Sequence, residues 1–365
     1  MKTNALYVHI PFCDHICTYC DFPKIFFHEE MVNEYLEALG KELATLPHHV
    51  MDTVYIGGGT PSSLDDEQLM KLFDLLHPFI GKETEEVTME VNPESMDLYK
   101  LDILKRGGVN RLSIGVQTFN DQLLKTIGRY HSSAQALRLI RQAHEKGFEN
   151  LSIDLMYGLP LQTKEDIVKD ISIVSNLPIT HLSYYALILE DRTVLHNQNY
   201  EPLEEEEEAL INDLIDAQLG SFGFHKYEVS NYAKAGYESL HNKAYWHYDN
   251  YYGVGMGATS KIDDEIIDHT REINHYIAGQ DITVTTKQTK QETMFNQLMM
   301  SLRLVEGLDL EVFKKRYDLS VEDVYKEALQ KHLDNKDLVI EDNHLKTTPR
   351  SLEYLNTILL DFMKD

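Results

Sequence analysis

The chain has 365 residues, of which 42% are hydrophobic, and a formal net charge of −26. This length suits one large α/β domain with a smaller second domain. The acidic charge argues against nucleic-acid binding and against electrostatic attachment to an anionic membrane, because both require basic surfaces. No apolar run reaches the roughly 18 residues of a membrane-spanning helix. The first strand-like segment follows no signal-peptide pattern, so we expect a cytoplasmic protein.

Apolar runs alternate with amphipathic stretches in the first half of the chain. The runs predict β-strands near residues 5–10, 52–57, 85–91, 110–116, 150–156 and 180–187. The stretches between them predict α-helices near residues 30–46, 65–80, 97–106, 132–147 and 163–176. Strands separated by helices form parallel sheets with right-handed crossovers. The pattern therefore predicts an α/β fold, a partial (β/α)6 TIM-like barrel.

Polar or glycine-rich segments stand at or near the C-terminal end of each predicted strand. They are the cysteine loop after residue 10 and the segments 57–61, 90–93, 115–117, 154–160 and 183–185. The carboxyl ends of barrel strands are where such folds place their active sites. We therefore expect one functional site at this edge of the barrel, beside a lateral opening that admits a large ligand.

The pattern becomes irregular after about residue 220 and then changes character. A stretch rich in Thr, Gln and Lys predicts a linker over residues 281–292. Beyond it, the sequence predicts helices near 292–304, 309–317 and 321–333 and a hairpin over 338–348. We expect a barrel domain over 1–280 with its C-terminal extension, and a small winged-helix-like α+β domain over 293–365. This second domain shows no basic recognition helix, so we expect a structural or partner-binding role.

All three cysteines lie in one short segment, Cys13-Asp-His-Ile-Cys17-Thr-Tyr-Cys20. Thiolates are ligands of iron–sulfur clusters, and three of them can hold a four-iron cluster while one iron stays open. An odd count in a long chain argues against a disulfide framework. On spacing alone, a zinc site completed by His9 or His15 and a set of buried free thiols are the alternatives.

The segment from Tyr7 to Cys13, with the cysteine spacing after it, resembles the radical S-adenosylmethionine (SAM) superfamily. Further segments resemble the branch that contains oxygen-independent coproporphyrinogen III oxidases and HemW-type heme chaperones. These segments are residues 57–61, 90–93, 115–119, 128–131 and 154–160. The resemblance covers nearly the whole chain, including the C-terminal module.

The resemblance implies a [4Fe–4S] cluster held by Cys13, Cys17 and Cys20, with SAM on the open iron. It implies that SAM is surrounded by Tyr7, Tyr19, Gly58, Gly59, Thr60, Glu90, Gln117, Arg129 and Asp154. Glycines would let the backbone approach the methionyl amine, because they carry no Cβ. The polar side chains would contact the amine, the carboxylate and the ribose hydroxyls, and Tyr19 would pack on the adenine.

Two branches of this family differ near the third cysteine. The oxidases typically carry a fourth cysteine two residues later and an N-terminal extension, whereas this chain has Phe22 and a strand that starts within six residues. The segment His241-Asn-Lys-Ala-Tyr245-Trp246 resembles a motif of the chaperones. An imidazole can ligate heme iron, and aromatic rings offer a flat apolar surface to a porphyrin. Hydrogen bonding of the histidine and ordinary packing of the tryptophan are the structural alternatives.

We therefore predict a heme chaperone on a radical SAM scaffold, which binds heme, the cluster and SAM and delivers heme to a hemoprotein acceptor. An oxygen-independent coproporphyrinogen III oxidase is the alternative, and a carrier role is favoured over this dehydrogenase chemistry. No catalytic side chain is predicted. The resemblance also suggests a homodimer and transient contact with respiratory proteins at the membrane.

Overall fold

The computed structural model describes residues 3–191, 193–198, 200–280 and 282–363. Within them, twelve strands form one sheet in the order β14-β13-β12-β11-β1-β4-β5-β6-β7-β8-β10-β9. Its parallel core is β1 (Ala5–Ile10), β4 (Thr53–Gly58), β5 (Glu86–Val91), β6 (Arg111–Gln117), β7 (Asn150–Tyr157) and β8 (His181–Ala186). The predicted partial barrel is confirmed, and these strands begin and end within one residue of the predicted bounds.

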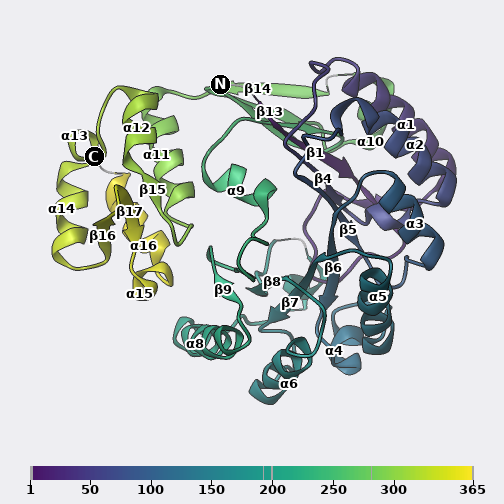
Figure 1. The fold of residues 1–365 in the computed structure, drawn as a ribbon, viewed down its shortest axis with the longest axis horizontal. Coiled ribbons are helices and arrows are strands. Elements are labelled where there is room, and N and C mark those ends of the chain that lie inside the picture. The colour runs from purple at the N-terminus through teal and green to yellow at the C-terminus, as the bar shows by residue number, and fades with distance from the viewer. Residues whose placement is uncertain (1–2, 192, 199, 281, 364–365) are drawn as a thin grey trace.

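Helices cover the outer face of the parallel strands (Figure 1). They are α1 (Glu29–Leu43), α2 (Asp66–Leu76), α3 (Leu98–Arg106), α4 (Asp121–Thr126), α5 (Ser133–Glu145) and α6 (Lys164–Val174). Capping boxes begin three of them, at Asp65, Ser132 and Thr163. The strands beneath are buried almost throughout, which explains why they appear in the sequence as continuous apolar runs.

Short strands extend the sheet at both edges, in the region where the sequence pattern is irregular. At one edge, β11 (Tyr251–Val254) runs parallel to β1, and β12 (Thr259–Ile262), β13 (Glu265–His269) and β14 (Thr283–Lys287) follow antiparallel. At the other, β10 (Asn231–Ala233) and β9 (His225–Lys226) pair antiparallel beyond β8. The connecting helices are α7 (Val194–Asn197), α8 (Glu205–Ser221) and α10 (Ile273–Ala278). No helix in the described part of the chain is long and apolar enough to cross a membrane.

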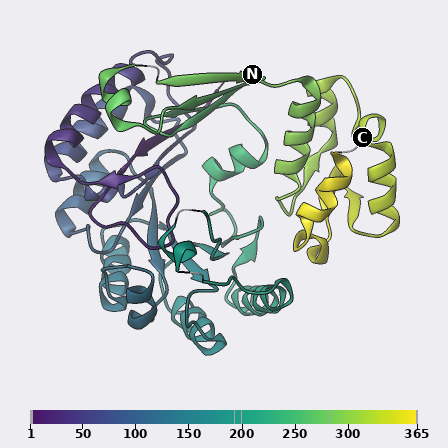
Figure 2. The ribbon, with the colours of Figure 1, turned by 180° about the vertical axis from the view of Figure 1, so that it is seen from behind.

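Helix α9 (Leu240–Trp246) lies between the sheet and the C-terminal domain, as both ribbon views show (Figures 1 and 2). The buried carboxylate of Glu86, at the start of β5, accepts hydrogen bonds at the start of this helix. Its donors are the Leu240 N–H at 2.9 Å, the His241 N–H at 3.3 Å and the Ser239 hydroxyl at 3.2 Å. A carboxylate satisfies the free N–H groups of a helix N-terminus, so Glu86 fixes α9 against the sheet.

The C-terminal domain has a hydrophobic core of its own, centred on Leu298, Phe313, Leu345 and Ile358. Its elements are α11 (Lys290–Ser301), β15 (Leu308–Asp309), α12 (Leu310–Tyr317), α13 (Val321–Val324), α14 (Lys326–Asp334), β16 (Leu338–Glu341), β17 (His344–Thr347), α15 (Pro349–Leu352) and α16 (Leu355–Phe362). The predicted hairpin is present, and its turn residues Asp342 and Asn343 both have positive φ, as tight hairpins require. The helix predicted over 321–333 is instead two helices, because Tyr325 leaves helical geometry.

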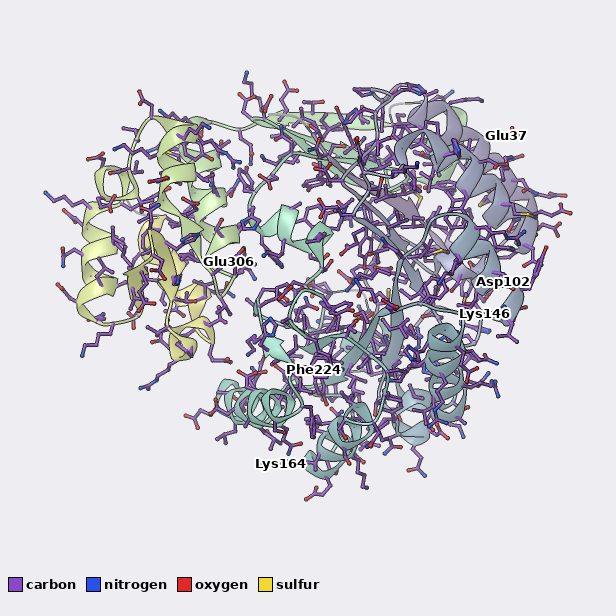
Figure 3. The ribbon with its side chains drawn as sticks, viewed as in Figure 1. Glu37, Asp102, Lys146, Lys164, Phe224 and Glu306 are labelled. Carbon is purple, nitrogen blue, oxygen red and sulfur yellow. The ribbon has the colours of Figure 1, made fainter. Side chains whose placement is uncertain are left out.

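The predicted linker over 281–292 is wrong in its extent. Residues 283–287 form the edge strand β14, and α11 begins at Lys290 with Thr289 as its N-cap. Strand β14 is exposed along its whole length, so it lacks the apolar alternation by which strands are recognised, although Thr and Val favour extended structure. Glu306, labelled in Figure 3, follows α11. Its carboxylate pairs with Lys243 at 3.2 Å and His247 at 3.1 Å, which joins the C-terminal domain to α9.

Candidate functional site

A cavity of about 280 Å³ opens at the carboxyl ends of the barrel strands. All but one of the side chains expected around the cluster and SAM line it. They are Cys13, Cys17, Tyr19, Cys20, Gly58, Gly59, Thr60, Glu90, Gln117, Arg129 and Asp154. The exception is Tyr7, which lies behind the wall and donates from its hydroxyl toward the His9 ring at 2.9 Å. Parallel strands therefore bring the predicted residues together at one edge of the sheet, as expected.

The cysteine loop is anchored at both ends. Strand β2 (Phe12–Cys13) pairs with β3 (Ile25–Phe26), and the Lys24 ammonium donates to the Cys20 carbonyl at 2.6 Å. The Thr60 hydroxyl is 3.5 Å from the Cys13 sulfur, and an Arg129 N–H group is 3.7 Å from the Cys17 sulfur. Burial raises the pKa of the Cys13 thiol to about 11 and also raises that of Cys20. These contacts turn the sulfurs toward the cavity and place a cation beside one of them.

The geometry disfavours the zinc alternative. Among the described residues, no three His, Cys, Asp or Glu side chains gather closely enough to hold one metal ion. In a four-iron cluster each sulfur binds a different iron, so the sulfurs need not converge on one atom. His9 is engaged at both ring nitrogens, with Tyr7 and with the Pro23 carbonyl at 2.8 Å. His15 stacks on Tyr130 with ring centroids 3.5 Å apart.

The end of β4 requires glycine for two separate reasons. Gly58 has φ of 121°, and a Cβ there would lie 2.8 Å from the His9 ring. At Gly59 a Cβ would lie 2.8 Å from both the Cys13 sulfur and the Pro11 carbonyl carbon. Real Cβ atoms do not approach so closely, so the backbone forms the cavity wall directly beside the cysteine loop.

Two carboxyl groups lie in the wall of the cavity. Glu90 accepts from the Tyr55 hydroxyl at 2.9 Å and from the Gly58 N–H at 3.1 Å, and burial raises its pKa to about 7. Asp154 accepts from the Ser113 hydroxyl at 3.2 Å, and burial raises its pKa as well. Burial disfavours the charged form of both carboxyl groups, so a ligand that brings donors or positive charge would stabilise their carboxylates.

Gln117 and Arg129 carry polar atoms that are buried without a partner among the described residues, namely Gln117 Oε1 and Arg129 Nε. Gln117 has φ of 61° at an irregularity in the β6–β7 pairing, so its backbone is strained where its side chain enters the cavity. The Arg129 guanidinium is fixed by the Asn92 side-chain oxygen and the Gly115 carbonyl, each at 2.7 Å. A ligand in the cavity would satisfy these atoms.

The residues expected to contact heme lie elsewhere. His241 is fully buried, and its ring nitrogens meet the Thr53 hydroxyl and the Tyr245 hydroxyl, each at 2.8 Å. The expectation that His241 ligates heme does not fit this arrangement, because neither nitrogen is free. Tyr245 packs edge-on against His241, and Trp246 packs against a small cluster beside Tyr227. The structural alternatives therefore describe these side chains better.

Comparison with known proteins identifies the chain. Residues 7–174 match the model of the radical SAM superfamily, and residues 288–352 match the HemN C-terminal domain. The heme chaperone HemW of Bacillus subtilis (strain 168) is 38% identical over 351 residues, which cover 92% of each chain. The chain belongs to the HemW family.

Other relatives agree with this assignment. HemW of Lactococcus lactis subsp. lactis (strain IL1403) is 34% identical and covers 100% of this chain and 98% of its own. HemW of Escherichia coli (strain K12) is 31% identical, and the match covers 99% of this chain and 98% of that protein. Among solved structures, Escherichia coli coproporphyrinogen III oxidase (HemN), a radical SAM enzyme, superposes with a TM-score of 0.85 over 98% of this chain and 89% of that one. At 24% identity this likeness shows the fold.

Radical SAM membership implies a [4Fe–4S] cluster and SAM, and the cavity of this HemW-family chain fits both. Three thiols lie on one loop, glycine backbone lies beside them, and the side chains of Gln117 and Arg129 line the same space. Sequence reasoning missed several lining residues: Tyr55, Asn92, Arg111, Ser113 and Tyr185. Asn92 and Tyr185 belong to segments that the sequence analysis had singled out, whereas no pattern pointed to Arg111 or Ser113, which both lie in the buried first half of β6.

Proposed function

We propose that the chain is a heme chaperone, which binds heme and passes it to a hemoprotein acceptor. One observation carries this proposal: the similarity to proteins named heme chaperone HemW extends over 92% of both chains at 38% identity. The similarity to an oxidase of known structure is weaker in sequence and concerns the fold. Phe22, at the mouth of the cavity, occupies the position where the oxidases typically have a fourth cysteine.

We further propose that Cys13, Cys17 and Cys20 hold the cluster. SAM would then lie against the glycine backbone of β4, with Glu90 and Asp154 toward its donors and its positive charge. Arg129, fixed by Asn92, would face the carboxylate of SAM, and Gln117 would supply an acceptor through its unpaired oxygen. When bound, a reduced cluster of this kind supplies an electron to the sulfonium of SAM.

The domain boundary, the cellular context and the partners complete the proposal. The two separate hydrophobic cores support a boundary at Gln288 and Thr289, between β14 and α11. We infer that the protein acts in the cytoplasm on a respiratory hemoprotein or its assembly machinery at the membrane. Homodimerisation belongs to the same proposal.

Anaerobic reconstitution with iron and sulfide, followed by hemin titration, tests the proposal. We expect a saturable Soret band and transfer of the bound heme to an apo-hemoprotein. A protein that shows no saturable hemin binding but converts coproporphyrinogen to protoporphyrinogen would be an oxidase. A colourless protein after reconstitution would contradict the cluster as well.

A further inference from the structure

Arg111, at the start of β6, is a buried arginine inside the barrel. Its side chain is 2% exposed and lines the cavity beside the cysteines. Barrel interiors are normally filled with branched apolar side chains, and an arginine keeps its proton in proteins. This position therefore introduces a permanent positive charge into the barrel, which is costly unless negative charge lies nearby.

Strand β6 runs between the two strands that carry carboxyl groups into the cavity. Glu90 on β5 stands opposite Ser113, and Asp154 on β7 stands opposite Gly115. Arg111 and Ser113 are two residues apart, so their side chains share the inward face of β6. The guanidinium consequently enters the barrel between the strands of Glu90 and Asp154, and all three side chains line one cavity.

Arg111 makes few direct contacts for a buried arginine. Its hydrogen bond to the Thr88 hydroxyl is long, at 3.5 Å, and its Nε has no partner among the described residues. Within the same residues it forms no ion pair. Glu86, the carboxylate nearer the start of β5, already accepts from four donors, which are Thr88, Ser239, Leu240 and His241. Hydrogen bonds therefore satisfy Glu86 without an ion pair to Arg111.

The charge of Arg111 acts on Glu90 and Asp154 without occupying their oxygens. Burial raises the pKa of Glu90 to about 7 and raises that of Asp154, and the positive charge of Arg111 opposes both shifts. The donors that reach these oxygens are all neutral: they are the Tyr55 hydroxyl, the Gly58 N–H and the hydroxyls of Ser113 and Ser183. A cation held at a distance favours the carboxylate form while the lone pairs stay open to a ligand.

The other groups around the two carboxyls do not replace this charge. Arg129 also lowers the pKa of Asp154, but Asn92 and the Gly115 carbonyl hold its guanidinium, and Asp154 raises the pKa of Glu90 by repulsion. The remaining ionisable groups are neutral, because burial raises the pKa of the tyrosines and lowers that of the histidines. They are Tyr7, Tyr55, Tyr185, Tyr245, His181 and His241.

We propose that Arg111 is a positioning residue for SAM, whose positive charge keeps Glu90 and Asp154 in the carboxylate form that the donors and the sulfonium of SAM require. This inference rests on the SAM site of the proposed function and adds a residue that does not itself contact the ligand. It explains why an arginine occupies the barrel interior without an ion pair, since an ion pair would cover the carboxylate oxygens.

SAM titration across a range of pH tests this role in the anaerobically reconstituted full-length protein. Arg111→Met removes the charge at similar length, Arg111→Lys retains it, and Arg138→Met makes the first change at an exposed position of α5. Without the charge, the pKa of both carboxyl groups rises, so SAM binding is lost at a higher pH as the pH falls. We expect this midpoint to be about one pH unit higher in Arg111→Met, with about tenfold weaker binding at pH 7, and the other two variants to be near wild type.

Infrared titration of the ligand-free protein provides a second readout, which a purely structural role would not move. The carbonyl band that is missing from Glu90→Gln reports the protonated Glu90 carboxyl, and it should appear at a higher pH in Arg111→Met than in wild type. A loss of SAM affinity that is equal at every pH, with the band unmoved, would mean that Arg111 contacts SAM or only supports the fold, and would overturn the proposal.

Circular dichroism reports whether each variant is folded. Should Arg111→Met not fold, Arg111→Gln, which keeps a donor for Thr88, is the second neutral variant, with the same expected shifts. In the wild type, a Glu90 band that persists above about pH 8 would also overturn the proposal, because Arg111 would then not hold the group ionised. If the wild-type protein binds no SAM, the SAM site of the proposed function is wrong, which is a separate failure.

Discussion

Replacing His241 with alanine separates a structural histidine from a heme ligand. The imidazole is fully buried and joins the Thr53 hydroxyl on β4 to the Tyr245 hydroxyl on α9. His241→Ala leaves both hydroxyls buried without this partner, at a cost of about 1–3 kcal/mol each. It also removes the ring that packs between Tyr55 and Tyr245. We expect the free energy of unfolding to fall by about 3–5 kcal/mol in total.

Urea unfolding followed by circular dichroism measures this change in stability. Hemin titration, at a temperature where the variant is folded, measures whether its heme affinity has changed. We expect a lower midpoint at an unchanged denaturant slope, together with hemin affinity equal to wild type. His275→Ala, at an exposed position of α10, is the control and should change neither. An unchanged midpoint with lost hemin binding would refute the reasoning, because a ligand would then reach a side chain that the structure encloses.

Three further predictions concern the same residues and the cysteine loop. Burial lowers the pKa of His241 to about 3 from an ordinary 6.5, so the unfolded state takes up this proton first as the pH falls. The contribution of His241 to the free energy of unfolding is complete above pH 6.5, and about 2 kcal/mol of it is lost by pH 5. The urea midpoints of the wild type and His241→Gln should therefore converge between pH 6.5 and pH 5. A constant difference between the two midpoints over that range would contradict this. Cys17→Ser should abolish the visible absorption of the reconstituted cluster, and full iron content in that variant would count against the cluster ligands. Gly59→Ala should at least halve cluster content, since its Cβ would lie 2.8 Å from the Cys13 sulfur, whereas Gly220→Ala, with nothing within 4 Å, should leave it unchanged.

The parallel strands were predictable because each is buried on both faces, and its sequence is therefore a nearly continuous run of apolar residues. The edge strands were not: β14 is exposed throughout, and β9 has two residues, too few for any period. The short helix α9, which follows β10, likewise depends on contacts with Thr53 and Glu86, far earlier in the chain. Local sequence determines elements whose own side chains form the core, and distant partners determine the others.

The cavity beside the cysteines was predictable for a topological reason. Carboxyl ends of parallel strands meet at one edge, so glycine and polar residues marked separately on five strands had to converge there. The direction in which each side chain points was harder to predict. Tyr7 and His241 both lie in segments that the sequence analysis had singled out. The Tyr7 hydroxyl nevertheless bonds to the His9 ring behind the cavity wall, and the His241 side chain is fully buried. The position of His241 depends on Glu86, 155 residues earlier, which no local pattern reveals.

Within the described residues, helix α9 is joined to the sheet through the side chains of Glu86 and Thr53, and it takes part in no strand pairing. The stretch between β10 and β11 can consequently be lengthened, shortened or exchanged without breaking a strand pairing. Evolution or engineering could thus reshape the interior of the barrel, and with it the size of molecule admitted, while the cysteine-bearing edge keeps its geometry. Helix α9 can therefore vary in sequence and length while the strand pairings of the sheet stay the same.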